Sequence, residues 1–402
     1  MDLYTRYQYT YFIHSYDVGE DKYSKYLLRL LKDKRFSLTI FEKERDLEIY
    51  TNFTEYARNL FFPTFELTKK EFSNLSTNKK MKILKKNYCT CFEYNLKEDM
   101  QGKAGTQDGI FFKVQKIELI CFKTGICFLC IKTNVEGSNN FSDVLDFNYK
   151  FKESNSKFSE LKNFENIRIQ SNMFKTMKEL PQFIKDITGK NVDYKEFYTY
   201  SYTCVDSQDW NEENDFEKIE PQFLKYITTS PNGYNADYNR KKKNIFKTIS
   251  KFKYTRYGIT KNSSCLLVSS MEPFNYTKLP YIYENQYRYT YIINLYLKIY
   301  LEKIDLMIKT CTTKALKEFL KFTKEIWEKN ITNKETASTY NKELLDVLEV
   351  EKTYKRILNK YKLLFNNEKI EKQIRINNIL KFFLIISLLL NVILIVKIIW
   401  GN

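Results

Sequence analysis

The sequence predicts a cytosolic α+β or α/β domain, followed by a long helical stalk and one C-terminal transmembrane helix. One observation is a change of composition: every proline and all but one glycine lie before residue 284, and residues 281–400 contain neither. Two others are a strand-forming run at 110–134 and an apolar run at 379–400. We therefore expect three parts: a cytosolic domain over 1–283, antiparallel stalk helices over 284–378, and a membrane span over 379–400.

Residues 1–283 alternate segments that are typical of strands and of helices. The strongest strand signal is IFFKVQKIELICFKTGICFLCIKTN, from Ile110 to Asn134, in which Lys123-Thr124-Gly125 supplies a turn between two apolar runs. This pattern predicts a β-hairpin. Asn140 before Phe141 is typical of a helix cap, and Leu47–Phe53 has the composition of a strand.

The stalk is predicted to contain one helix over about 287–329 and a second that starts near Lys334 and continues into the span. The second helix carries a 3-4-3-4-3 spacing of apolar residues, which is the pattern of a coiled-coil seam. The seam consists of Val347, Val350, Tyr354, Ile357, Tyr361 and Leu364. Two partners fit this seam, either the helix at 287–329 of the same chain or a second copy of the chain.

The C-terminal run has the length and the flanking residues of a membrane span. Its 22 residues from Ile379 to Trp400 would extend ~33 Å as a helix, which matches the core of a bilayer. Basic residues lie on its N-terminal side, so we expect the bulk of the chain in the cytoplasm and the basic residues near anionic lipid. These membrane-proximal residues are Lys369, Lys372, Arg375 and Lys381. The localisation predicted is therefore a single-pass membrane protein with membrane lipids as partners.

Polar residues of the span fall on one side of the helix. At ~100° per residue, Ser387, Asn391 and Asn402 lie within one arc. Polar groups in a bilayer seek partners, so this stripe indicates a contact with another helix or a water-filled pore. Either role favours a homo-oligomer.

Composition excludes several classes of function. The net charge of +17 comes without a recognition motif for nucleic acid, so no nucleic-acid partner is predicted. A single histidine gives little support to metalloprotease, zinc-deaminase or Ser-His-Asp chemistry, and no enzymatic activity is predicted. The eight cysteines are interpreted as buried thiols without structural disulfides.

An acidic segment has the oxygen ligands that a hard cation prefers. Its candidate ligands for Mg²⁺ or another divalent cation are Asp206, Asp209, Glu212 and Glu213. The alternative is a solvated acidic loop without a metal.

Two regions resemble the CorA-type divalent-cation transport proteins. They are IELICFKTGICFLCIKT (Ile117–Thr133) followed by FSDVLDF, and the stalk with its apolar end, Tyr287–Asn402. In that family the first membrane helix ends in Gly-Met-Asn and lines the pore of a pentamer, and a second membrane helix follows. The present sequence reads Trp400-Gly401-Asn402 and has no second span, so Gly401 and Asn402 are the counterparts of the motif.

Two functions follow as hypotheses. The first is a divergent CorA-like oligomer that transports or senses divalent cations, with Ser387 and Asn391 facing the pore. The second is a membrane-tethered interaction or sensor module without transport activity.

Overall fold

A computed structural model describes residues 3–63, 68–96, 100–105, 109–154, 167–170, 177–191, 197–212, 215–231 and 246–400. Within the last helix it describes the backbone throughout, and the side chains other than those of 367–371, 385 and 388–400. The chain divides into two compact units. Unit 1 comprises Met1–Tyr300 and Glu325–Glu349, and unit 2 comprises Leu301–Lys324 and Val350–Asn402.

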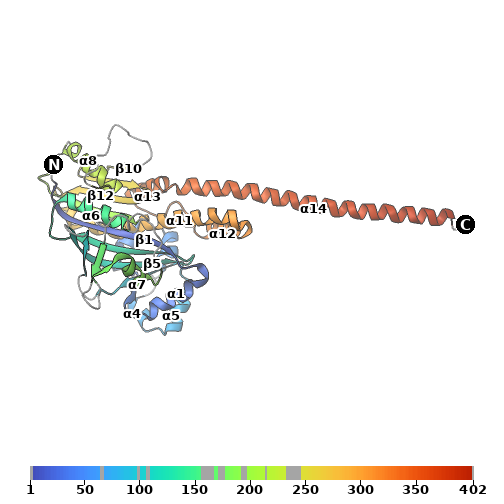
Figure 1. The fold of residues 1–402 in the computed structure, drawn as a ribbon, viewed down its shortest axis with the longest axis horizontal. Helices are drawn as coiled ribbons and strands as arrows, with labels where there is room; N and C mark the ends of the chain where they lie inside the picture. The colour runs from blue at the N-terminus through green and yellow to red at the C-terminus, as the bar shows by residue number, and fades with distance from the viewer. Residues whose placement is uncertain are drawn as a thin grey trace. The chain divides into compact units, whose positions relative to one another are not determined.

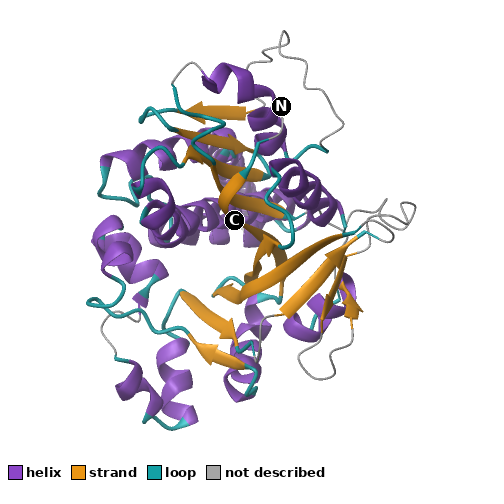
Figure 2. Ribbon diagram, turned by 90° about the vertical axis from the view of Figure 1, so that its left-hand side faces the viewer, coloured by secondary structure: helices purple, strands orange, loops and turns teal. Residues whose placement is uncertain are grey.

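Unit 1 is built on a mixed sheet, in which the described residues form twelve strands (Figures 1 and 2). The strand order is β10-β11-β12-β9-β1-β6-β5-β4-β7-β8, and β3 pairs with both β2 and β5. All pairs are antiparallel except β12 with β9. The strands are β1 (Thr5–Asp17), β2 (Phe36–Leu38), β3 (Cys89–Tyr94), β4 (Met100–Ala104), β5 (Ile110–Phe122), β6 (Ile126–Val135), β7 (Ile167–Gln170), β8 (Met177–Glu179), β9 (Tyr198–Val205), β10 (Phe246–Ile249), β11 (Thr255–Thr260) and β12 (Ser263–Ser269).

The helices of unit 1 lie on both faces of this sheet (Figure 2). A single π-helical turn, η3 (Tyr283–Tyr287), leads directly into α11. The helices are α1 (Glu20–Lys32), α2 (Leu47–Asn52), α3 (Glu55–Phe61), α4 (Lys69–Ser73), α5 (Thr77–Leu84), α6 (Phe141–Glu153), α7 (Leu180–Thr188), α8 (Asp215–Thr228), α9 (Phe274–Thr277), α10 (Leu279–Ile282), α11 (Arg288–Thr310) and α13 (Glu335–Val347).

Aromatic residues fill the space between one face of the sheet and α6. The ring of Phe12 on β1 stacks on that of Phe151 on α6, with centroids 3.8 Å apart. On the same face the Tyr23 hydroxyl of α1 donates a hydrogen bond of 3.1 Å to the carbonyl of Cys121. These side chains belong to a contiguous buried core, so burial of apolar area is the main force that holds this layer.

The opposite face of the sheet packs against η3, α11 and α13 through tyrosines. The Tyr200 hydroxyl donates a hydrogen bond of 2.6 Å to the Tyr283 carbonyl, and the hydroxyls of Ser264 and Tyr340 lie 2.6 Å apart. Tyrosine suits this layer because its ring packs as an apolar group while its hydroxyl finds a buried partner. The sheet is therefore covered on both faces.

The predicted hairpin is confirmed. Strands β5 and β6 pair antiparallel, with Cys121 opposite Cys127 across the turn. Gly125 in this turn has a φ of +88°, a conformation that costs a residue with a side chain ~1–2 kcal/mol. The helix cap is confirmed as well, because the Asn140 side chain accepts a hydrogen bond of 3.1 Å from the backbone N–H of Ser142.

The predicted strand at Leu47–Phe53 is wrong. These residues form α2, which buries Ile49 and Asn52. Phe53 after it forms an isolated bridge with Thr332, and Thr54 caps the next helix through a side-chain contact with Ala57. Contacts with a segment almost three hundred residues away thus override the local strand preference.

Unit 2 contains the C-terminal part of α11, with α12 (Thr312–Glu325) and α14 (Val350–Trp400). The helix expected over 287–329 is interrupted at Cys311. Helix α12 runs antiparallel to α14, since the ring of Phe322 lies beside Tyr354 while that of Phe319 contacts both Tyr354 and Tyr361. The first part of the predicted seam therefore packs within the chain.

The predicted transmembrane helix at 379–400 is wrong. Over the part of the chain that the structure describes, no helix combines the length and the apolar character that a membrane crossing requires. Among the described side chains of α14, the basic residues Lys372, Arg375 and Lys381 extend up to the start of the apolar stretch. The fold class is corrected accordingly: the chain mixes α-helices and β-strands as predicted, but the transmembrane helix is not supported. The predicted single-pass membrane localisation is not supported either.

Candidate functional site

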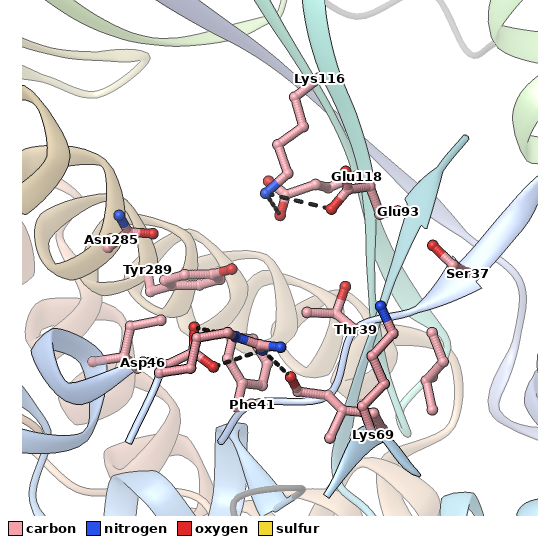
Figure 3. A pocket seen from close by; sticks show the side chains of 14 residues that line it. Ser37, Thr39, Phe41, Asp46, Lys69, Glu93, Lys116, Glu118, Asn285 and Tyr289 are labelled. Carbon is pink, nitrogen blue, oxygen red and sulfur yellow. Dashed lines mark hydrogen bonds and ion pairs between the residues drawn. The ribbon is translucent and has the colours of Figure 1, made fainter. Parts of the chain in front are cut away.

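A polar pocket of unit 1 is the best-defined candidate site (Figure 3). Its volume is about 260 Å³, and its walls come from β2 and the segment after it, the starts of α2 and α4, strands β3 and β5, and the η3–α11 turn. Apolar side chains line part of it. Its polar and titratable lining residues are Ser37, Thr39, Arg45, Asp46, Lys69, Glu93, Lys116, Glu118, Asn285 and Tyr289.

The inner wall of the pocket holds a buried ion pair. Glu118 on β5 and Arg288 at the start of α11 are each 1% exposed, and their charged groups lie 2.7 Å apart. Lys116 reaches the other oxygen of Glu118 at 3.0 Å. Burial alone would raise the pKa of Glu118, but Arg288 and Lys116 outweigh it and lower this pKa to about 2. Glu118 is therefore ionised at neutral pH.

Strand geometry places these charges. Lys116 and Glu118 are two residues apart on β5, so their side chains project from the same face of the sheet. Glu93 on β3 lies directly opposite Glu118 in the strand pairing, which would be repulsive without a cation between them. The ammonium of Lys116, 3.7 Å from Glu93, provides that cation.

A second, partly buried ion pair continues the charged network along the sheet face. Lys132 on β6 lies 2.6 Å from Glu284 of η3, and the Tyr11 hydroxyl also donates a hydrogen bond to Glu284. Burial would raise the pKa of Glu284, but Lys132 and Arg288 lower it below its usual value. The guanidinium of Arg288 lies 4.5 Å from the ring centroid of Tyr11, so a cation–π contact joins the two ion pairs.

The π-helical turn positions the residues of this network. An extra residue in the turn changes the direction in which successive side chains project, and such turns are frequent at functional sites. Here the turn lies where Glu284 faces β6, Asn285 lines the pocket and Arg288 faces β5.

The outer wall of the pocket is held by a separate pair. Arg45 contacts the carboxylate of Asp46 at 2.7 Å and also donates to the carbonyl of Ile40. Asp46 accepts a hydrogen bond of 2.8 Å from the backbone N–H of Glu42. Among the described residues, the Thr39 hydroxyl on this side has no hydrogen-bond partner.

Of the acidic residues predicted as metal ligands, Asp206, Asp209 and Glu212 lie in the segment between β9 and α8. Asp209 accepts a hydrogen bond of 2.7 Å from the backbone N–H of Tyr4, and Asp206 accepts one of 3.1 Å from the N–H of Gln208. Glu212 is exposed, and Glu213 lies outside the described residues. Across the described residues no group of three or more His, Cys, Asp or Glu could hold a metal ion. A divalent cation, Mg²⁺ included, stays a prediction.

The residues predicted on the C-terminal helix are only partly described. Lys372, Arg375, Lys381 and Ser387 are exposed on α14. The side chains of Lys369 and Asn391 lie outside the described side chains, and Gly401 and Asn402 lie outside the described residues. A pore role for Ser387 and Asn391, lipid binding by the basic residues, and the lack of a nucleic-acid partner stay predictions.

Large apolar side chains are exposed along the same helix. Leu380, Phe383 and Leu384 are 58%, 62% and 63% exposed. Other apolar residues of α14 that are exposed are Leu363, Phe365, Ile374, Ile376, Ile379, Phe382 and Ile386. Contiguous exposed apolar surface of this kind marks a site of association.

Comparison with known proteins gives no identification. No protein-family model matches the chain, and no curated protein matches it. The resemblance to CorA-type proteins therefore stays a prediction.

Proposed function

We propose that this chain is a homo-oligomeric interaction module that associates with further copies of itself through α14. The observation that carries the proposal is the exposure of Leu380, Phe383 and Leu384, each more than half accessible to solvent in the single chain. Burial of one such side chain contributes roughly 1.5–3 kcal/mol.

The apolar side chains surround the helix and do not form a single stripe. At ~100° per residue, the exposed residues from Ile374 to Ile386 point to all sides of α14. A helix that is apolar all round is stable in water only when neighbours cover it on more than one side. This favours a bundle of several helices over a two-helix contact.

A second copy is the partner that supplies such neighbours. Within the chain, the described ring contacts of α12 with α14 reach Tyr361 and no further. Every additional copy brings the same exposed helix, so association buries the apolar surface of both partners, as in symmetric oligomers generally. Leu306 and Leu320, exposed on the other helices of unit 2, add to the surface available.

The test is the mass of the full chain in solution, measured by sedimentation velocity at several micromolar concentrations. We expect a multiple of the monomer mass for the unmodified protein. The triple variant Leu380→Gln, Phe383→Gln, Leu384→Gln should shift the mass towards the monomer, because glutamine keeps the helix propensity and removes the apolar contacts.

The matched control carries the same number of glutamines on exposed polar positions of α14, namely Lys355→Gln, Lys362→Gln and Asn366→Gln. It should keep the mass of the unmodified protein. A monomeric unmodified chain, or a triple variant that stays fully associated, would refute the proposal.

A further inference from the structure

The polar pocket of unit 1 is lined by several side chains that can donate hydrogen bonds. Figure 3 shows the polar ends of Lys116, Tyr289, Thr39 and Lys69 directed towards the same cavity. They come from β5, α11, the segment after β2 and α4, which are far apart in the sequence. We propose that this pocket binds a small oxyanion, in the form of a carboxylate or a phosphate group.

The carboxylates of the lining are already engaged. Glu118 is shared by Arg288 and Lys116, and Asp46 is held by Arg45 and a backbone N–H. Glu93 lies near Lys116. Each carboxylate of the lining is thus paired with a cation of the protein.

Thr39 provides one unused donor. Its backbone is fixed by a hydrogen bond of 2.9 Å from its N–H to the carbonyl of Cys91. Its hydroxyl oxygen is shielded from solvent and has no hydrogen-bond partner among the described groups. A buried hydroxyl without a partner costs ~1–3 kcal/mol, and a bound ligand is one of the few explanations for such a group.

Lys69, an exposed residue, contributes a cation to the lining of the pocket. Its backbone N–H donates a hydrogen bond of 2.7 Å to the carboxylate of Glu42, which fixes the start of α4 at the rim of the pocket. No carboxylate forms an ion pair with its ammonium group in the described part of the chain. Lys69 and Thr39 both line the pocket (Figure 3).

Tyr289 and Lys116 complete the set of donors. Burial, together with the nearby charge of Glu118, keeps the pKa of the Tyr289 phenol well above its usual value, so its O–H remains available at neutral pH. The Lys116 ammonium has three N–H groups, and its described partners are the two glutamates.

Size and charge define the class of ligand. A cavity of about 260 Å³ lies just below the usual range of ~300–1,000 Å³ for small-molecule sites. The Lys69 ammonium together with hydroxyl donors in the same lining suits a compact anion better than a neutral or cationic molecule. Phosphate esters and small carboxylic acids both carry such a group.

The experiment is isothermal titration calorimetry of the full chain with inorganic phosphate and, separately, with succinate. Binding of only one of them assigns the group as phosphate or carboxylate. Lys69→Gln should weaken binding by about tenfold or more, which is the usual effect of losing a charged hydrogen bond. Lys70→Gln is the matched control, because Lys70 lies next to Lys69 on α4 but does not line the pocket.

Thr39→Val separates a ligand contact from a structural role. The hydroxyl has no hydrogen-bond partner among the residues that the structure describes, so this variant should not lower the thermal midpoint of the unliganded protein, while it should weaken anion binding. The proposal is overturned if neither anion binds, or if Lys69→Gln binds as tightly as Lys70→Gln.

Discussion

The buried pair of Glu118 and Arg288 should be a main support of unit 1, and Glu118→Gln tests it. The substitution keeps the shape of the side chain and removes its charge. Arg288, 1% exposed, would then be a buried cation whose nearest carboxylate has gone. Removing one partner of a buried ion pair typically costs ~3–5 kcal/mol, mostly because the other charge is left uncompensated.

The pKa of Glu118 gives a second measure of the same effect. Its value falls from 4.5 to about 2 in the folded protein. At 1.36 kcal/mol per pH unit, this difference corresponds to about 3 kcal/mol. Because the pKa of Glu118 is lower in the folded than in the unfolded protein, its contribution to the free energy of unfolding is complete above pH 4.5. That contribution is lost as the pH falls towards 2. Glu118→Gln should therefore also flatten the acid side of the stability profile.

Urea unfolding provides the assay, with tryptophan fluorescence as the signal, to which the fully buried Trp210 of unit 1 contributes. The control is Lys261→Gln, which removes an exposed pair with Glu349 at 3.2 Å and should cost no more than ~1 kcal/mol. In the double variant Glu118→Gln, Arg288→Met, the loss of unfolding free energy should be smaller than the sum of the losses of the two single variants. The reason is that neither charge of the buried pair is then left without its partner.

The reasoning is refuted by either of two results. One is that Glu118→Gln lowers the free energy of unfolding at pH 7 by no more than Lys261→Gln does. The other is an acid profile of the variant that is as steep as that of the unmodified protein between pH 4.5 and 2.

Two further substitutions test the backbone, with the same urea assay. Gly125→Ala should lower the free energy of unfolding by more than ~1 kcal/mol, because φ at Gly125 is +88° and the added Cβ would lie 2.5 Å from the backbone of Gly19. An unchanged free energy of unfolding would contradict this account of the turn. Glu349→Gly should raise the free energy of unfolding by up to ~1 kcal/mol, because glycine adopts the positive φ of 55° between α13 and α14 without strain. Glu349→Val should lower the free energy of unfolding, and the reverse order of the two variants would contradict the strain at this position.

The parts of the fold that follow from short stretches of sequence could be predicted. The β5–β6 hairpin depends on two neighbouring apolar strands and a glycine in the turn between them, all within 25 residues. The cap at Asn140 depends on one side chain and the N–H two residues later. Local hydrogen bonding and local apolar pattern decide such elements.

Elements that depend on distant contacts were predicted less well. Leu47–Phe53 contains β-branched and aromatic residues that fit a strand, yet it forms α2. The Asn52 carbonyl accepts a hydrogen bond of 2.7 Å from the N–H of Asn333, and Phe53 pairs with Thr332. No local pattern carries information about a partner at that distance along the chain.

The polar pocket was missed for the same reason. Glu118 was visible as a lone carboxylate within the apolar run IELICF, which is a signal of a buried charge that needs a partner. Its partner, Arg288, lies far along the chain at the start of a tyrosine-rich helix. Thr39 and Lys69 carry no signal at all in the sequence, because their role depends on three-dimensional convergence.

The structure shows which partner the apolar seam from Val347 to Leu364 packs against. The spacing from Val347 to Leu364 fitted either a helix of the same chain or a second copy. Val350 and Ile357 are fully buried, and the ring of Phe319 contacts Tyr354 and Tyr361, so α12 occupies this seam.

After Leu364 the same spacing reaches Glu368, Glu371, Arg375 and Asn378, which are polar, so the internal seam has no apolar continuation. The exposed apolar side chains from Ile379 to Ile386 therefore need a partner other than α12. Because the described contacts of α12 leave this stretch uncovered, association between copies is expected to depend on Leu380, Phe383 and Leu384. The seam residues that first suggested oligomerisation should instead affect the stability of the single chain.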